Sequence, residues 1–113
     1  MTNPFESLRI PAIVGKVSES YSSTIICQKS GNFISMMVAE LEPGKFAFGF
    51  DVSIDGRRRK MLPGEGQGYF LTREDAELYA LGYIKARAQN MPHEFLDAIN
   101  SNIAARQSLS LFD

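Results

Sequence analysis

The stretch that decides the fold is FISMMVAELEPGKFAFGFDVSIDG, residues 33–56. Two apolar runs flank residues 42–45, where Pro is followed by Gly, as a type II turn requires. In the second run, every other residue is large and apolar: Phe46, Phe48, Phe50, Val52 and Ile54. This alternation predicts a strand covered on one side, so the stretch as a whole predicts a β-hairpin.

Further strands are predicted on both sides of this hairpin. Asp55-Gly56 is a tight-turn dipeptide, so residues 57–62, RRRKML, are predicted to form the next antiparallel strand. Upstream, YSSTIICQ at residues 21–28 predicts a short strand, followed by a turn at Ser30, Gly31 and Asn32. Downstream, PGEGQG predicts a loop before a short strand in YFL, residues 69–71.

Two helices are predicted after the strands. Thr72 followed three residues later by Asp75 resembles a capping box and opens a helix that continues to about residue 89. Its main apolar stripe is Ala76, Tyr79, Ala80, Tyr83 and Ile84. A second helix is predicted from Pro92, at the first helical position, to about Arg106. Its stripe is Phe95, Leu96, Ile99 and Ile103.

These elements predict an α+β fold, with an antiparallel sheet of three to four strands followed by two C-terminal helices. A chain of 113 residues is long enough for one core, so we expect one domain. We expect an extended N-terminal arm at residues 1–20, the domain at 21–106 and a C-terminal tail at 107–113.

The composition of the chain indicates where the protein is located and which kinds of partner it is able to bind. Cys27 is the only cysteine, so no intrachain disulfide can form, and a reducing, cytoplasmic location is expected. The sequence has no secretion leader and no apolar run of about 18 residues, so we expect no membrane contact. The net charge of −1 argues against a broad positive surface, although local basic patches remain open.

The residue patterns typical of enzyme active sites are missing from the sequence. We therefore expect no catalysis, no cofactor and no metal. His93 is either a general base or metal ligand, or a solvated residue at a helix start, which is the favoured interpretation. Cys27 is either a nucleophile or, as favoured, a buried small hydrophobe. GEGQG, residues 64–68, could expose N–H groups to a phosphate, but it does not open a helix directly.

A basic cluster follows the hairpin: Arg57, Arg58, Arg59 and Lys60. Four positive charges at a sheet edge predict contact with nucleic-acid phosphates. The alternative is a solvated edge strand that resists aggregation, and this alternative is favoured about two to one. The phenylalanines before the cluster are interpreted as core rather than as base-stacking platforms.

Residues 45–87 combine a hairpin, a basic turn, a strand and a helix entered through Phe70, Thr72 and Ala76. This order resembles the three-stranded-sheet-plus-helix DNA-binding modules of phage integrase amino-terminal domains and plant ethylene-response factors. The resemblance implies DNA binding by the sheet. This chain differs in its Gly-rich insert before Phe70 and in having no tryptophan in the first strand.

The tail contains Leu109-Ser110-Leu111-Phe112, preceded by Ser108 and Gln107 and followed by Asp113. It resembles the short peptide by which bacterial polymerases, repair proteins and mobile-element proteins bind the replication sliding clamp. The resemblance implies that Gln107, Leu109, Leu111 and Phe112 contact the clamp. The glutamine stands one position earlier than in the usual form. An equally weighted alternative is that the apolar tail residues pack on their own domain.

Two functions are therefore expected from sequence. The first is a non-catalytic bacterial DNA-metabolism or mobile-element accessory protein, with a clamp-binding tail and a DNA-binding hairpin. The alternative is a protein-interaction or dimerisation module with no nucleic-acid role. It is motivated by Leu78 and Leu81, which lie on the opposite side of their helix from the main stripe.

Overall fold

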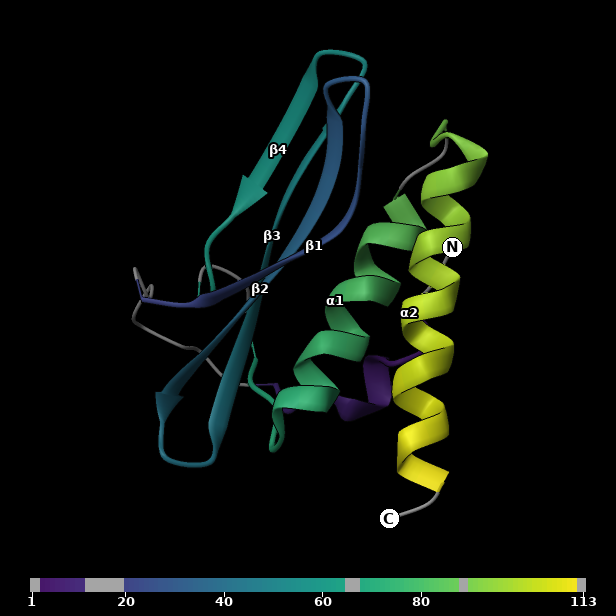
Figure 1. The fold of residues 1–113 in the computed structure, drawn as a ribbon. Coiled ribbons are helices and arrows are strands. Elements are labelled where there is room, and N and C mark those ends of the chain that lie inside the picture. The colour runs from purple at the N-terminus through teal and green to yellow at the C-terminus, as the bar shows by residue number, and fades with distance from the viewer. Residues whose placement is uncertain (1–2, 12–19, 65–67, 88–89, 112–113) are drawn as a thin grey trace.

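The computed structural model describes residues 3–11, 20–64, 68–87 and 90–111, with side chains described as far as Gln107. Four antiparallel strands form one sheet in the order β1-β2-β3-β4. They are β1 (Ser22–Lys29), β2 (Asn32–Glu42), β3 (Lys45–Ile54) and β4 (Arg57–Met61). Each strand pairs with the next one along the chain, so the sheet is a meander (Figure 1).

The turns form where the sequence predicts them. Glu42 pairs with Lys45 around Pro43-Gly44, and the φ of 81° at Gly44 is the positive value that a type II turn needs. Asp55 and Gly56 both have positive φ, 53° and 79°, which twists the β3–β4 hairpin in the favoured sense. The predicted hairpin and the strand after it are confirmed.

Two helices, α1 (Arg73–Arg87) and α2 (His93–Leu111), cover one face of the sheet (Figure 1). Thr72 Oγ1 accepts a hydrogen bond of 3.1 Å from the Asp75 N–H, so the predicted N-terminal cap is present. The Pro92 carbonyl accepts bonds from the N–H groups of Phe95 and Leu96. Pro92 therefore immediately precedes α2, which begins at His93, one residue later than predicted.

The main core lies between the sheet and the helices. Phe48, 5% exposed, packs its ring 5.0 Å from the ring of Tyr79 on α1. Its neighbours on this face, Phe46 and Phe50, are half-buried against the same cluster. These phenylalanines are core residues, as the alternation predicts. The other buried members include Ile34, Met36, Val38, Phe70, Ala76, Ala80, Leu81, Ile84, Phe95 and Ile99.

The opposite face of the sheet is also buried along its middle, contrary to the prediction of a strand covered on one side only. Met37, Ala39 and Ala47 are each no more than 3% exposed. Gly49 lies against backbone atoms of Met61 and Pro63, where no Cβ would fit. The small residues of β3 that look like a solvent face in the sequence instead admit close approach of the following chain segment.

The first residues are packed on the domain instead of forming an extended arm. A short 3-10 helix, η1 (Glu6–Leu8), contacts α1. Asn3 Nδ2 donates a 3.0 Å hydrogen bond to the Tyr79 carbonyl. Ile10 forms a bridge with Tyr69, which lies next to the second bridge of Phe46 with Phe70. Residues 12–19 of the predicted arm lie outside the described residues.

The second helix is longer than predicted. Its apolar stripe is buried as expected at Phe95 and Ile99, which are no more than 1% exposed. Its predicted end at Arg106 is wrong by five residues, because α2 continues to Leu111. The backbone of residues 107–111 is therefore helical rather than extended, and Phe112 and Asp113 lie outside the described residues.

Candidate anion-binding cleft

The register of β4 divides the basic cluster between the two faces of the sheet. Arg57 pairs with Ile54 and Arg59 pairs with Val52, and paired residues of antiparallel strands share a face. Arg57 and Arg59 therefore lie on the helix side. Arg58 and Lys60 lie on the other side. The expectation of four adjacent charges on one surface is thus replaced by two pairs.

Arg58 is engaged within the protein. Its guanidinium donates two hydrogen bonds to Asp51, of 2.9 Å from Nε to Oδ1 and 2.7 Å from Nη2 to Oδ2. It also lies over the Phe33 ring, with its Cζ 5.8 Å from the centroid. Asp51 is only 8% exposed, and its hydrogen bonds raise the pKa of Arg58. The arginine satisfies a carboxylate that would otherwise be buried alone.

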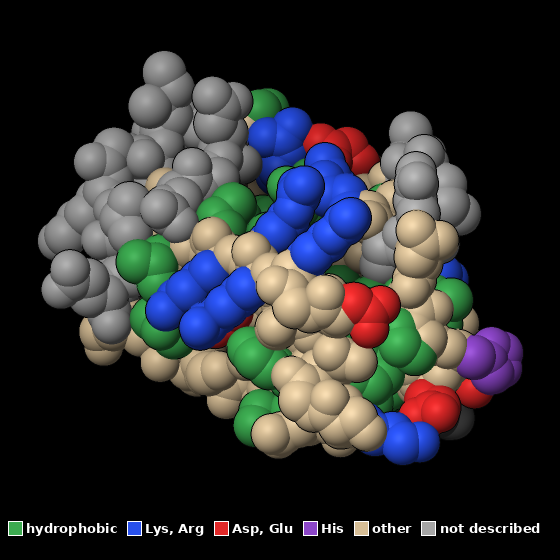
Figure 2. All heavy atoms as spheres, turned by 90° about the horizontal axis from the view of Figure 1, so that it is seen from above, with side chains coloured by type: hydrophobic (Ala, Val, Ile, Leu, Met, Phe, Trp, Pro, Cys, Tyr) green, Lys and Arg blue, Asp and Glu red, His purple; other side chains and the backbone are tan. Residues whose placement is uncertain are grey.

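Arg57 and Arg59 line a cleft of about 860 Å³ between β4 and the end of α1. Figure 2 looks down on the end of the molecule with the β3–β4 turn and shows Lys and Arg side chains gathered there beside hydrophobic ones. The lining residues from β3 and the β3–β4 turn are Phe50, Val52, Ile54 and Asp55. Those from α1 and the segment before α2 are Tyr83, Ile84, Ala86, Arg87, Asn90 and Met91. The cleft combines an apolar wall with a basic rim.

A cation and two aromatic rings stack at the α1 side of this cleft. The Cζ of Arg87 lies 3.5 Å from the centroid of the Tyr83 ring. The Tyr83 ring is in turn 5.4 Å from the Phe50 ring, at an interplanar angle of 32°. The i, i+4 spacing of Tyr83 and Arg87 on a helix produces the first contact. This spacing is the sequence signal that could have identified Tyr83 and Arg87. Neither residue was assigned to a site from the sequence.

The cleft is a positive site. Its lining holds three arginines and one aspartate, Asp55, giving a formal charge of +2. Within the part of the chain that is described, no ion pair involves Arg57, Arg59 or Arg87. The carboxyl end of α1 adds a partial negative charge, but Lys85 and Arg87 in its last turn offset it. The arrangement suits an anion that also carries an apolar or aromatic surface.

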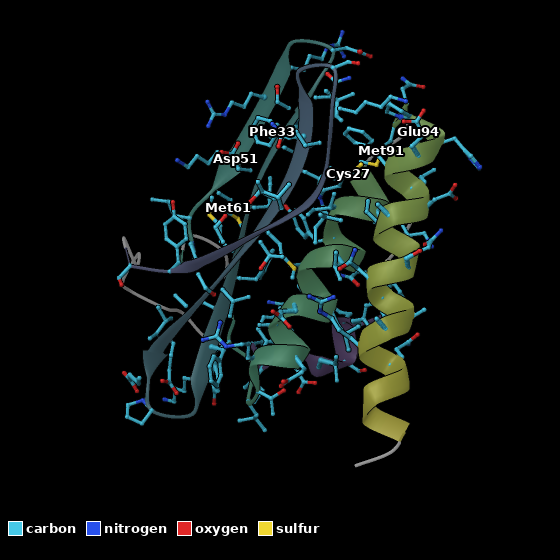
Figure 3. All side chains as sticks on the ribbon, viewed as in Figure 1. Cys27, Phe33, Asp51, Met61, Met91 and Glu94 are labelled. Carbon is cyan, nitrogen blue, oxygen red and sulfur yellow. The ribbon has the colours of Figure 1, made fainter. Side chains whose placement is uncertain are left out.

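The other residues considered for chemistry are His93, Cys27 and the Gly-rich loop. His93 is the first residue of α2, with an 87% exposed side chain 3.3 Å from Asp97. Cys27 on β1 and Met91 before α2 both pack on the core, and Figure 3 shows them between sheet and helix. Among the described residues, no group of three His, Cys, Asp or Glu side chains is placed to hold a metal. Residues 65–67 of the Gly-rich loop lie outside the described residues.

Leu78 and Leu81, expected on a partner face, are buried within this chain. They are 6% and 0% exposed. Leu81 belongs to the same buried cluster as Phe95 and Ile99 of α2, and α1 also packs on η1. The second apolar side of α1 exists as predicted, but α2 and η1 lie where a partner was expected. The assignment of these leucines to a dimer face is therefore corrected.

The expected clamp-binding residues are described only in part. Gln107 is an exposed residue of α2. Leu109 and Leu111 belong to the same helix by backbone, while their side chains, and all of Phe112, lie outside the described residues. The last described side-chain contact between α2 and α1 is the ion pair of Arg106 with Glu77, 3.2 Å from Nε to Oε1.

The protein is thus an α+β domain with a cationic cleft at one end of its sheet. Comparison with protein-family models, with curated proteins and with solved structures gives no match. None of the helices in the described ranges is long and apolar enough to cross a membrane. The function is therefore argued from the cleft and from the sequence of the tail.

Proposed function

We propose that this protein is a non-catalytic DNA-binding accessory protein, which contacts DNA through Arg57, Arg59 and Arg87. The observation that carries the proposal is the convergence of these three arginines, from β4 and α1, on one cleft without ion-pair partners among the described residues. Arginines placed in this way attract phosphates, and their binding releases condensed counterions. Arg58 and Lys60 are not part of the proposed contact, because they lie on the other face.

The test is a fluorescence anisotropy titration of labelled DNA with the full chain at several salt concentrations. Arg59→Glu is expected to weaken binding at least tenfold. Lys60→Glu makes the same change of charge one residue away on the opposite face, so it is the matched control and is expected to have a much smaller effect. Equal loss in both variants, or no binding by the native protein at tens of micromolar, would contradict the proposal.

We infer from the tail sequence a second interaction, with a bacterial sliding clamp. Its support is the sequence Leu109-Ser110-Leu111-Phe112, which follows Arg106, the residue paired with Glu77, along the chain. Binding in extended form requires the last turn of α2 to unwind. The cost is small because terminal helical residues lack part of their hydrogen bonds. A clamp-binding domain of this kind fits an accessory role in DNA metabolism, including one on a mobile element.

The clamp interaction is tested with purified clamp and the full-length protein. Changing Leu111 and Phe112 together to Ala is expected to abolish binding, since burial of each large side chain contributes about 1.5–3 kcal/mol. Ser108→Ala is the control in the same turn and is expected to retain binding. If the native protein does not bind clamp at tens of micromolar, this second interaction is rejected and DNA binding stands on its own test.

A further inference from the structure

We propose that the cleft binds one nucleotide unit of a single-stranded nucleic acid, with a phosphate at Arg57 and Arg59 and the base stacked on the Arg87 guanidinium. This inference rests on the proposed function and adds that the site prefers single-stranded to double-stranded nucleic acid. It follows from three properties of the cleft: the position of its charges, its stacked cation and its apolar wall.

The two β4 arginines form one phosphate site. Arg57 and Arg59 are two residues apart on the same face of a strand, which places their backbones about 7 Å apart. Both side chains are exposed and both line the cleft. Two guanidinium groups at this spacing are able to contact one phosphate together or two successive phosphates of one strand.

The stacked cation supplies a platform for a base. The Arg87 guanidinium lies over Tyr83, which packs on Phe50, so the stack is anchored in the core. Arg87 is exposed and lines the cleft, so a second planar group bound there would stack on its guanidinium. Nucleic-acid bases that are not paired stack on guanidinium planes and aromatic rings in this manner.

The wall of the cleft favours a base over a purely ionic ligand. Val52, Ile54 and Met91 are half-buried and line it beside the arginines. Asn90 and Asp55 add an amide and a carboxylate at the rim, which suit the donor and acceptor groups of a base edge. In a duplex the bases are already stacked, and removing one from the stack costs a few kcal/mol. A single strand has no such cost.

The experiment compares a labelled oligothymidylate of about 20 nucleotides with a duplex of equal length, titrated with the full chain at low salt. The single strand is expected to bind at least tenfold more tightly. Arg87→Lys keeps the charge and removes the planar group, so it is expected to weaken single-strand binding about fivefold and leave duplex binding unchanged. Arg87 is exposed, so this variant tests the stack without removing a core residue.

Salt dependence separates the phosphate contacts from the stack. Each phosphate contact on a single strand contributes a slope of about −0.7 to log K against log salt concentration. Changing Arg57 and Arg59 together to Ala is expected to reduce the slope by about 0.7, the value for one phosphate, whereas Arg87→Lys is expected to leave it unchanged. The same slope in both variants would contradict the assignment of the phosphate to β4.

Competition with small probes identifies the bound unit. Thymidine monophosphate is expected to displace the oligonucleotide at concentrations where inorganic phosphate and thymidine do not. Equal affinity for single strand and duplex, with both lowered by Arg59→Glu, would overturn this inference and leave the proposed DNA binding intact. No binding of either DNA would overturn both. Binding of thymidine monophosphate without the oligonucleotide would assign the cleft to free nucleotides instead.

Discussion

Tyr79 connects the core to the first residues of the chain through its hydroxyl. The hydroxyl donates a 2.7 Å hydrogen bond to Glu6 Oε2, while the ring packs against Phe48 and Phe70. Burial, together with the neighbouring carboxylate, raises the pKa of Tyr79 to about 12 from its ordinary value of 10.0. The folded protein therefore favours the neutral phenol.

This shift makes stability depend on pH in the alkaline range. The contribution is fully present below pH 10, the ordinary value, and is lost as the pH rises to about 12. A difference of this size corresponds to about 3 kcal/mol of unfolding free energy. Urea unfolding between pH 8 and pH 12 measures it. Tyr79→Phe is expected to flatten the alkaline part of the plot of unfolding free energy against pH. Tyr21→Phe is the control and is expected to leave that part unchanged. Equal plots for the native protein and Tyr79→Phe would contradict the argument.

The same hydrogen bond acts in acid through Glu6. Bonds from Tyr79 and Arg9 lower the pKa of Glu6 below 4.5, so the folded protein favours the carboxylate. This contribution is present above that value and is lost as the pH falls below it. Glu6→Gln is expected to reduce the acid dependence of unfolding, and Glu42→Gln, on an exposed turn, serves as the comparison. If the unfolding free energy of Glu6→Gln falls in acid as steeply as that of the native protein, this role of Glu6 is contradicted.

Gly49 and Gly82 lie where another segment of the chain packs closely against the backbone. A Cβ on Gly49 would meet backbone atoms of Met61 and Pro63, the latter at 2.8 Å from its nitrogen. Backbone cannot rotate away as a side chain does, so Gly49→Ala is expected to lower stability by about 3 kcal/mol. In Gly82→Ala the new methyl meets the side chains of Asn3 and Phe5, and the helix gains up to about 1 kcal/mol of propensity. Chemical denaturation should rank Gly49→Ala as the more damaging change, and the reverse order would contradict this packing.

At the scale of elements, the start of α1 depends on a single side chain. Thr72 Oγ1 accepts the Asp75 N–H, one of the donors that have no partner within the helix. Thr72→Ala is expected to cost about 1 kcal/mol, and Thr72→Ser, which keeps the acceptor, much less. The unfolding free energy gives the cost, and amide exchange at Asp75 should become faster in the Ala variant alone. Equal stability of the Ala and Ser variants would exclude a role for the cap.

The elements with local signals were the ones that could be predicted. Pro43-Gly44 and Asp55-Gly56 determine turns by their backbone preferences, and the alternation from Phe46 to Ile54 identifies a strand without reference to the rest of the fold. The end of α2 had no such signal. Residues 107–111 interrupt the apolar stripe but contain no Gly or Pro, so the helix continues to Leu111.

The cleft could be predicted only in part, because it joins distant segments. Strand alternation alone divides Arg57 and Arg59 from Arg58 and Lys60, so the split of the cluster was within reach of the sequence. The role of Arg58 could not be predicted, since it depends on Asp51, two residues from the one that Arg58 pairs with, being nearly buried. The spacing of Tyr83 and Arg87 signals their stack, but its place in the same cleft as Arg57 and Arg59 was not predictable, since that depends on how α1 packs on β2 and β3.

At the scale of the whole molecule, the chain covers its own apolar surfaces. The helices cover one face of the sheet, the middle of the other face is buried as well, and α2 and η1 cover the far side of α1. Among the described residues, the exposed large hydrophobics are Ile25 and Leu71, at 63% and 60% exposed. Ile25 lies on β1 and Leu71 lies between β4 and α1, and two separate residues do not make a continuous apolar patch of the kind that marks an obligate interface.

This closure predicts that folding does not depend on association. Leu81 is fully buried in the cluster shared with α2, so Leu81→Ala is expected to lower the unfolding free energy by about 3 kcal/mol through the cavity it leaves. If Leu81 were covered by a second copy, the melting temperature would rise with protein concentration. We expect the melting temperature of each protein to be the same at two concentrations a hundredfold apart. The difference between the native protein and Leu81→Ala is therefore expected to be constant. Ile25→Ala, on the exposed face of β1, is the control and should change neither value appreciably. A melting temperature that rises with concentration in the native protein and not in Leu81→Ala would restore the dimer face that the burial of this leucine excludes.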